Sequence, residues 1–399
     1  MDKNKIFVLV LITVMDRAGA ETMMMNYLRN INRDKIQMDF LINRPDRADY
    51  EDEIEQLGSH VYHMCPLYPG KFGRYKREFR QFLTEHPEYQ IIHSHLEERS
   101  YFALKIAKQM GIPVRIVHAH SVPRHFNIKM PVRLWFRHKL KGTYTHRFAC
   151  GEEPAKWLYG TDKCVELEEV ANKSVAGDIA RDSTVIMKNA IDTRKFVYDE
   201  QVRRAVRKRL KIKNDTLVIG HVGRFTYEKN QTFLIDIFKN VNKMHPDSRL
   251  LLIGGGKPKE EIETKEAVRK KVQEMGLSSK VKFLGVRDDV NQLMQAMDIL
   301  VMPSTSEGFP VTLVEAQAAG LRCLVSDVVT YQCNVTEEMQ YMSLDEDAQE
   351  WANKILSFVS TKLSSEAMNE NVKAAGFDIK ENSQWIEKFY ELVRWRYKC

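Results

Sequence analysis

This chain of 399 residues has few of the features that mark disulfide-rich, membrane-spanning or repetitive proteins. It contains six cysteines, and no two of them form a C-x-x-C pair. The pattern therefore predicts reduced thiols and neither a disulfide framework nor a zinc site. No apolar run approaches the roughly 20 residues that a membrane-spanning helix needs. No low-complexity tract or short repeat is present, so the composition is that of an ordinary globular protein.

Several nucleotide-binding signatures are also missing. No Gly-x-Gly-x-x-Gly opens either half of the chain, which argues against a nicotinamide-dependent dehydrogenase. Three glycines at 254–256 follow an apolar run, but the Gly-Lys-Ser/Thr sequence of a P-loop is absent. No RNA-binding signature is present either, so nucleic acid is not an expected partner.

Apolar runs and amphipathic segments alternate along the chain, which predicts an α/β protein with doubly wound parallel sheets. In the first half, strands are expected at 6–11, 38–42, 61–64, 91–95, 114–119, 147–150 and 185–188. Helices are expected at 21–31, 49–57, 74–85, 100–110, 131–139 and 153–159. The first twenty residues also have the outline of a signal peptide. We favour a buried first strand because an amphipathic helix starts directly at Glu21.

The most informative segment is 299–325, which reads ILVMPSTSEGFPVTLVEAQAAGLRCLV. Two apolar runs, typical of buried parallel strands, enclose a polar loop and a helix over 311–319. Pro310 suits the first helical turn, and Gly320 suits the position after the last one. The segment therefore predicts a strand, a loop, a helix and a strand.

Two carboxylates flank the start of this helix. Glu315 follows Glu307 by a little over two turns, so both side chains can face one cleft. The first backbone N–H groups of a helix have no partner within it. Unpaired donors beside carboxylate acceptors suit a polyol, because each sugar hydroxyl both donates and accepts a hydrogen bond. The donor groups expected here are those of Gly308, Phe309 and Val311.

Two glutamates separated by seven residues, with Gly-Phe-Pro after the first, resemble the signature of retaining nucleotide-sugar glycosyltransferases of the GT-B fold. The resemblance is closest to glycosyltransferase family 4, in its bacterial polysaccharide-building branch. It implies two Rossmann-like, doubly wound domains that face a cleft. The expected parts are an acceptor-binding domain at 1–192, a nucleotide-sugar domain at 193–378 and a C-terminal helix at 379–399 that packs back on the first domain.

A second motif carries the resemblance further. The sequence from Gly223 to Asn230 is similar to the family's Gly-Arg-…-Glu-Lys-Asn, and it lies between a predicted strand and a predicted helix. Cations at such a place suit a pyrophosphate. The resemblance implies that Arg224 and Lys229 hold the donor diphosphate and help it leave.

The resemblance also assigns the remaining donor-site residues. It implies that Glu307 faces the donor sugar and that Glu315 binds the ribose hydroxyls. It also implies that the nucleobase contacts Val286 and Arg287, although the sequence match is less specific at these two positions. The other donor-site residues expected on this basis are Gly19, Gly308, Phe309, Pro310 and Val311.

Histidines end two predicted strands of the first half. In the family, a histidine at the second of these ends lies near the reaction centre, and His120 matches it best, with His118 as the alternate. The competing interpretation is that His120, like His93 and His95, is a buried residue that holds loops by hydrogen bonds. Metal ligation is possible by count, but no carboxylate lies at ligand spacing, and we expect no metal.

A basic block spans residues 71–147, with 16 Lys and Arg against five Asp and Glu. Its aromatic residues Phe126, Trp135 and Phe136 favour a membrane-surface contact over an RNA platform, although a solvated basic face is the alternative. The predicted location is cytoplasmic, with peripheral contact to the inner face of the plasma membrane.

The predicted function is transfer of a sugar from a nucleotide sugar to a glycan or lipid-linked acceptor, with retention, no cofactor and no metal. The alternatives are a sugar-nucleotide epimerase or hydrolase of similar fold, and a non-catalytic nucleotide-sugar-binding protein. The sequence does not identify the sugar, the base or the acceptor.

Overall fold

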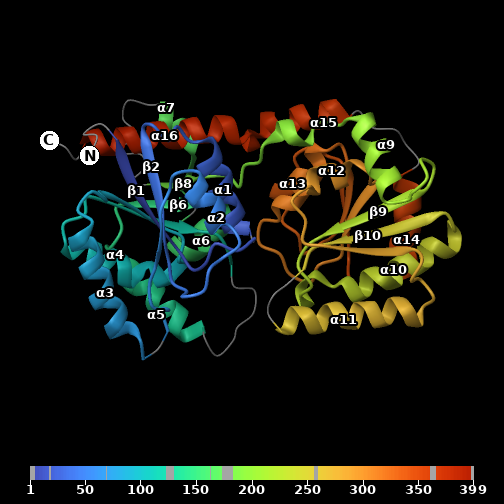
Figure 1. The fold of residues 1–399 in the computed structure, drawn as a ribbon, viewed down its shortest axis with the longest axis horizontal. Coiled ribbons are helices and arrows are strands. Elements are labelled where there is room, and N and C mark those ends of the chain that lie inside the picture. The colour runs from blue at the N-terminus through green and yellow to red at the C-terminus, as the bar shows by residue number, and fades with distance from the viewer. Residues whose placement is uncertain are drawn as a thin grey trace. The chain divides into compact units, whose positions relative to one another are not determined.

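A computed structural model describes residues 5–17, 19–68, 70–122, 130–161, 163–172, 183–255, 259–359 and 365–396. The chain divides into two compact units (Figure 1). Unit 1 comprises Met1–Ala190 and Asp378–Cys399, and unit 2 comprises Ile191–Phe377.

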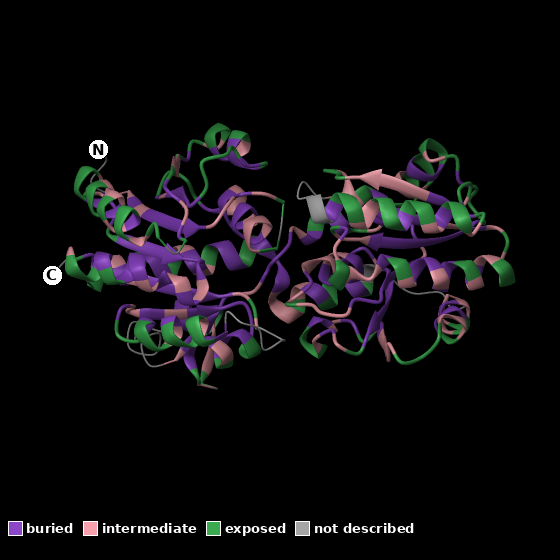
Figure 2. Ribbon diagram, turned by 90° about the horizontal axis from the view of Figure 1, so that it is seen from below, coloured by how far each residue is buried: buried purple, intermediate pink, exposed green. Residues whose placement is uncertain are grey.

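Unit 1 is built on an eight-stranded parallel sheet. Its strands are β1 (Ile6–Ile12), β2 (Ile36–Ile42), β3 (Val61–His63), β4 (Ile91–Ser94), β5 (Val114–Ala119), β6 (His146–Ala149), β7 (Cys164–Glu166) and β8 (Thr184–Ile186). They lie in the order β3-β2-β1-β4-β5-β6-β8-β7. Most strand residues are buried, because helices cover both faces of the sheet (Figure 2).

The helices of unit 1 are α1 (Gly19–Asn30), α2 (Glu51–Gln56), α3 (Phe72–Glu85), η1 (Glu97–Arg99), α4 (Ser100–Gln109), α5 (Met130–Leu140), α6 (Glu152–Tyr159), α7 (Leu167–Asn172) and α16 (Ile379–Arg396). The C-terminal helix α16 packs on the same face as α1 and α7, where Ile386, Phe389 and Tyr390 enter the core beside Val8 and Val10 of β1. The opposite face carries α3, α4, α5 and α6, packed against Leu9 and Leu11.

Unit 2 contains a six-stranded parallel sheet in the order β11-β10-β9-β12-β13-β14. Its strands are β9 (Leu217–Val222), β10 (Ser248–Ile253), β11 (Val281–Gly285), β12 (Ile299–Met302), β13 (Arg322–Ser326) and β14 (Met339–Met342). Its helices are η2 (Thr193–Phe196), α9 (Glu200–Arg209), η3 (Tyr227–Lys229), α10 (Gln231–Met244), α11 (Lys259–Glu274), α12 (Val290–Gln295), α13 (Val311–Ala318), η4 (Tyr331–Cys333), α14 (Ala348–Phe358), α15 (Ser365–Val372) and η5 (Lys373–Phe377).

In both sheets the strand order reverses between two central strands, and in unit 1 the short strand β7 also lies beyond β8 at the edge. The reversal lies between β1 and β4 in unit 1 and between β9 and β12 in unit 2. In open α/β sheets, ligands bind outside the carboxyl ends of the strands at this topological switch point. Each unit therefore has one edge where a binding site is expected.

The doubly wound α/β prediction is confirmed, and residues 6–12 form a central strand as expected. The short elements β7, α7 and β14 were not predicted. The helix begins at Val311 as expected, but one detail was wrong: Pro310 has extended backbone angles at the N-cap position and does not lie in the first helical turn. Gly320 follows the helix with φ of 75°, as a C′ glycine does. Among the described residues, no helix is long and apolar enough to cross a bilayer.

Candidate donor site and histidine stack

The loop that follows β9 and the loop that follows β12 meet at the switch point of unit 2. The backbone N–H of Thr305 donates to the carbonyl of Glu228 at 2.7 Å. The amide of Asn230 donates to the carbonyl of Pro303 at 3.1 Å. Asn230 takes a left-handed conformation, with φ of 53°, which short polar side chains tolerate better than most. These bonds hold the two loops in a fixed register.

An ion pair joins the same loops. Lys229 Nζ lies 2.6 Å from Glu307 Oε1, and the two side chains are only 21% and 8% exposed. Neither group is fully in water, so the charges are screened less than those of a surface pair. The sequence predicted both residues as donor-site groups, and the structure places them in direct contact.

Arg224 lies at the start of the loop after β9, where its guanidinium is more than half exposed. Its Nη1 is 2.9 Å from Oε1 of Glu261, a buried carboxylate at the beginning of α11. The carbonyl of Arg224 accepts a hydrogen bond from Gln231 at 2.7 Å. Sequence reasoning missed Glu261, because its surroundings alternate acidic and basic residues and read as a solvated helix face.

Glycines bring the ends of β9, β10 and β11 close together. A Cβ on Gly254, whose φ is 133°, would lie 2.0 Å from the carbonyl oxygen of Gly223. A Cβ on Gly255 would lie 2.9 Å from a methyl group of Val286. Only glycine fits at position 254, and a Cβ at position 255 would require the exposed Val286 side chain to move, so the backbone after β10 closely approaches both neighbouring loops. Arg224 and Val286 therefore lie on loops that are close together, as a site for one extended ligand requires.

Val286 is largely exposed, and Arg287 pairs with Asp289. Both side chains therefore stand at the surface of this edge of unit 2. The pair with Asp289 occupies the guanidinium of Arg287, and any contact of this residue with a base would be through its backbone or its aliphatic carbons.

The start of α13 presents its backbone to the same edge of the sheet. Gly308 is exposed, and the ring of Phe309 stacks on Phe377 with centroids 5.6 Å apart. Within the described part of the chain, no hydrogen bond uses the N–H of Gly308 or Phe309. Pro310 and Val311 follow, with Pro310 at the N-cap position. The expected donor groups are thus present where α13 begins.

Glu315 lies about one turn after Val311, the first residue of α13, and is half-buried. Burial raises the pKa of its carboxyl group to about 7, because the charged form loses solvation. Its carboxyl group therefore changes charge near neutral pH.

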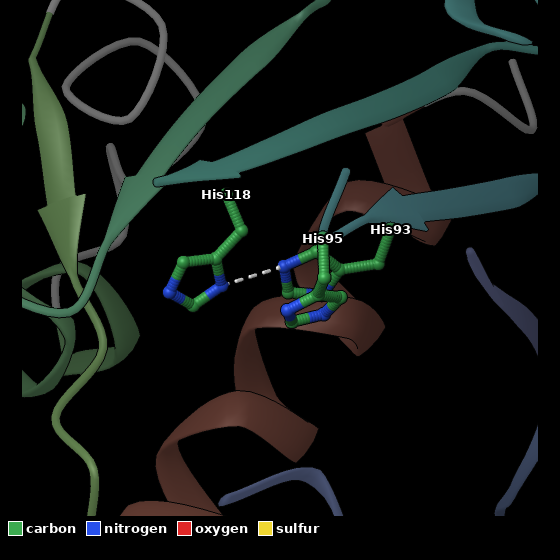
Figure 3. Close-up of side chains that lie close together, drawn as sticks. All are labelled: His93, His95 and His118. Carbon is green, nitrogen blue, oxygen red and sulfur yellow. Dashed lines mark hydrogen bonds between the residues drawn. The ribbon is translucent and has the colours of Figure 1, made fainter. Parts of the chain in front are cut away.

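In unit 1, four histidines stack where β4 and β5 end. The rings of His118 and His120 are 4.2 Å apart and 12° from parallel. His93 Nε2 lies 3.1 Å from His118 Nδ1, and His95 Nδ1 lies 2.7 Å from His120 Nε2. Figure 3 shows His93, His95 and His118 with the first of these bonds. The hydroxyl of Tyr390 on α16 is 2.9 Å from His93 Nδ1 and completes the chain.

Burial keeps these histidines neutral. It lowers the pKa of His93 to about 3 and that of His120 to about 4, and it lowers the pKa values of His95 and His118 well below the usual range. His120 is thus embedded in the hydrogen-bonded stack, which fits the structural interpretation and leaves the catalytic one as a prediction.

His93, His95 and His118 have ring nitrogens within 4.8 Å of one another, so they could approach one metal ion. However, His93 and His118 already bond to each other, and their rings are only 14° from parallel. Ligands of a tetrahedral ion point their lone pairs at a common centre. The stack is arranged as a hydrogen-bonded chain, and the expectation of no metal stays a prediction.

Glu97 supports the end of this stack. Its Oε1 accepts from the backbone N–H of His120 at 2.9 Å and from the hydroxyl of Ser121 at 3.2 Å. Burial raises its pKa to about 7, and its backbone is left-handed with φ of 53°. Sequence reasoning did not single out Glu97, because it stands in an acidic pair that resembles a solvated turn.

Gly19 is the first residue of α1 and is exposed. A Cβ at this position would meet nothing within 4 Å. Packing within the protein therefore does not require glycine here, and the assignment of Gly19 to the donor site stays a prediction. Gly19 and His120 belong to unit 1, whereas the other predicted site residues belong to unit 2.

Comparison with known proteins settles the family. The model for glycosyl transferases group 1 matches residues 202–375, and the model for the glycosyl transferase 4-like domain matches residues 18–158. The putative glycosyltransferase EpsF of Bacillus subtilis is 30% identical over 397 residues, which cover 98% of each chain. This chain belongs to the GT-B glycosyltransferases of group 1 and family 4.

One further sequence relative and one solved structure resemble this glycosyltransferase. The UDP-Gal:α-D-GlcNAc-diphosphoundecaprenol α-1,3-galactosyltransferase of Escherichia coli is 24% identical and covers 77% of this chain and 76% of its own. The crystal structure of Anabaena HepE in complex with UDP and glucose has a TM-score of 0.74 at 19% identity, covering 96% of this glycosyltransferase and 99% of HepE. The latter shows a shared GT-B fold.

Proposed function

We propose that this glycosyltransferase moves a sugar from a nucleoside diphosphate sugar to a lipid-linked glycan acceptor in bacterial cell-surface polysaccharide synthesis. One observation carries the donor assignment: Lys229 and Glu307 touch at the switch point of unit 2, with Arg224 on the same loop as Lys229. A cation and a carboxylate side by side match a ligand that is a diphosphate at one end and a polyol at the other.

The relatives support the substrate classes. EpsF is a putative glycosyltransferase, the E. coli relative uses a UDP-sugar and a diphosphoundecaprenol-linked acceptor, and HepE binds UDP and glucose. The sugar and base of the present donor stay open, because the backbone groups around Gly308 fit many hydroxyl patterns.

We propose the following reaction. The bond between the anomeric carbon and the donor diphosphate breaks, and an acceptor hydroxyl forms the new glycosidic bond on the same face of the sugar. The hydroxyl proton passes to an oxygen of the leaving diphosphate. Arg224 and Lys229 balance the charge that develops on this leaving group, together with the N–H groups at the start of α13. These groups take the role that a metal ion would have, so the proposed reaction is metal-independent.

The proposed location is the cytoplasmic face of the plasma membrane. Helix α5 exposes Val132, Leu134 and Trp135, the last with 49% of its surface accessible, and its last turn carries Arg137, His138 and Lys139. Aromatic and basic side chains on one helix suit an anionic lipid surface. Residues 123–129 of the predicted contact segment lie outside the described part of the chain.

The test is an incubation of the enzyme with a panel of nucleotide sugars, with and without a lipid-linked glycan acceptor. Nucleotide release that requires the acceptor, together with an extended glycan, supports the proposal. Epimer formation or acceptor-independent hydrolysis would support the sugar-nucleotide alternative, and binding without turnover would support a non-catalytic protein. Co-sedimentation with liposomes that shows no preference for anionic lipid would remove the membrane contact.

A further inference from the structure

Unit 1 has a small cavity at its own switch point. Its volume is about 80 Å³, room for two or three waters or one phosphate-sized group. Thr13 follows β1, Asn43 follows β2 and Arg99 follows β4, and all three line the cavity. The cavity thus occupies the position in unit 1 where open parallel sheets bind ligands.

A buried amide forms part of the cavity lining. Asn43 is only 3% exposed, and its backbone N–H donates to the carbonyl of Thr13 at 3.2 Å. Neither its side-chain nitrogen nor its side-chain oxygen finds a hydrogen-bond partner among the described residues. Buried polar groups without partners are rare in folded proteins and are costly. The amide is therefore placed to bond to a ligand in the cavity.

The cavity is also positively charged. Arg99 donates from Nη2 to the hydroxyl of Thr13 at 3.3 Å, and the guanidinium of Arg44 lies over the ring of Tyr68 at 5.7 Å. Neither arginine pairs with a carboxylate in the described parts of the chain. An arginine fork with no acidic partner suits an oxyanion.

The acidic neighbours of Arg99 are turned to other partners. Glu98 pairs with Arg133 at 2.7 Å, and Glu97 accepts from His120. The turn η1 therefore contributes a cation to the cavity and directs its two carboxylates elsewhere.

We infer that this cavity binds a phosphoryl group of the acceptor, with Arg99 and Arg44 on its oxygens and Asn43 on an adjacent hydroxyl or ester oxygen. That the ligand is the acceptor rests on the proposed function. That the site binds an anion rests on the residues that line the cavity. A phosphoryl group could come from the diphosphate of a lipid-linked sugar or from free phosphate, so the test must separate these sources.

The experiment measures binding to the full-length chain by calorimetry. The probes are farnesyl diphosphate, glucose 1-phosphate, inorganic phosphate and, as a neutral reference, methyl glucoside. The variants are Arg99→Gln and the exposed Arg44→Gln, with Arg80→Gln on the surface of α3 as a matched control. UDP binding is measured on every protein as a separate readout of unit 2, and thermal melting reports folding.

The expected result is that glucose 1-phosphate or farnesyl diphosphate binds more tightly than methyl glucoside. Arg99→Gln and Arg44→Gln should each weaken that binding about tenfold, while UDP binding and the control stay unchanged. Equal binding by wild type and both variants, or binding of inorganic phosphate alone, would overturn the inference. If the wild type does not bind UDP, the donor assignment in unit 2 is contradicted. The anion-binding measurements then still test the cavity in unit 1 independently.

Discussion

Lys229 Nζ donates to Glu307 Oε1 across 2.6 Å, so a basic and an acidic group of the proposed donor site touch each other. The two residues come from loops after different strands, β9 and β12, which are neighbours in the sheet. A donor diphosphate would draw the ammonium toward its oxygens and leave the carboxylate to accept from sugar hydroxyls. Each residue then keeps a charged or hydrogen-bonded partner when the ligand binds.

Lys229→Ala should lower kcat by about 10² to 10³, because one preorganised cation is lost from the leaving group. It should also reduce stability by about 1–3 kcal/mol, because the carboxylate of Glu307 loses its partner in a site where it is only 8% exposed. Initial rates and urea unfolding measure the two effects.

Two further variants separate the effect on turnover from the effect on stability. Lys239→Ala removes an exposed lysine on α10 and should change neither quantity. The double variant Lys229→Ala/Glu307→Gln removes the unpaired carboxylate, so it should recover stability without recovering turnover. An unchanged rate in Lys229→Ala would show that the diphosphate lies elsewhere.

The arrangement of the 299–325 segment could be predicted because local signals agree there. Its apolar runs have strand length, and Gly320 marks the helix end. The helix begins at Val311 as predicted, but Pro310 takes extended angles at the N-cap position and does not belong to the first helical turn. The strands β7 and β14 escaped prediction because they have only three and four residues, and many of these are half-buried or polar.

Pairing between distant residues could not be predicted in the same way. Glu307 follows Lys229 by 78 positions, and Glu261 follows Arg224 by 37. Such contacts depend on strand order, which composition and periodicity do not encode. The anion cavity was missed for the same reason, because Thr13, Asn43 and Arg99 meet only after β2, β1 and β4 have aligned.

Removal of divalent metal should leave turnover unchanged. If Arg224 and Lys229 neutralise the leaving diphosphate, then activity after dialysis against EDTA should match the untreated rate within about twofold. Restoration by Mg²⁺ or Mn²⁺ of an activity lost on dialysis would contradict metal independence. The Lys229→Ala variant serves as the comparison. Added Mg²⁺ could raise its activity, because the metal ion could replace part of the missing positive charge.

Glu315 should make donor affinity depend on pH. Its pKa is raised to about 7 by burial, and ribose hydroxyls that donate to it would favour the ionised form. Binding below pH 7 must then release a proton, so affinity should rise up to tenfold per pH unit until about pH 7 and level off above it. UDP-glucose is a suitable probe because its diphosphate does not titrate in this range.

The matched variant is Glu315→Gln, which cannot ionise and should show a flat profile between pH 5.5 and 8. Equal pH dependence in both proteins would remove Glu315 from the ribose contact. An affinity that falls as pH rises would indicate that the protonated carboxyl group donates to the ligand.

The histidine stack should make unit 1 sensitive to acid. Burial lowers the pKa of His93 to about 3 and that of His118 well below normal, whereas both titrate near 6.5 in the unfolded chain. The unfolded state therefore takes up protons first as pH falls, so the stability that these residues contribute is complete above pH 6.5 and declines below it. The expected loss between pH 6.5 and 5.5 is about 1 kcal/mol for each of the two fully buried rings, because the unfolded ring is already half protonated at pH 6.5.

Tryptophan fluorescence during urea unfolding can measure this loss, because four of the five tryptophans belong to unit 1. His118→Gln should lower stability at pH 7.5, since it breaks the bond to His93, but it should reduce the pH slope because one titrating group is gone. His138→Gln, at an exposed position of α5, should leave the slope unchanged. A slope equal in wild type and His118→Gln would mean that the ring already carries its proton in the folded protein, and the stack would then be a charged cluster.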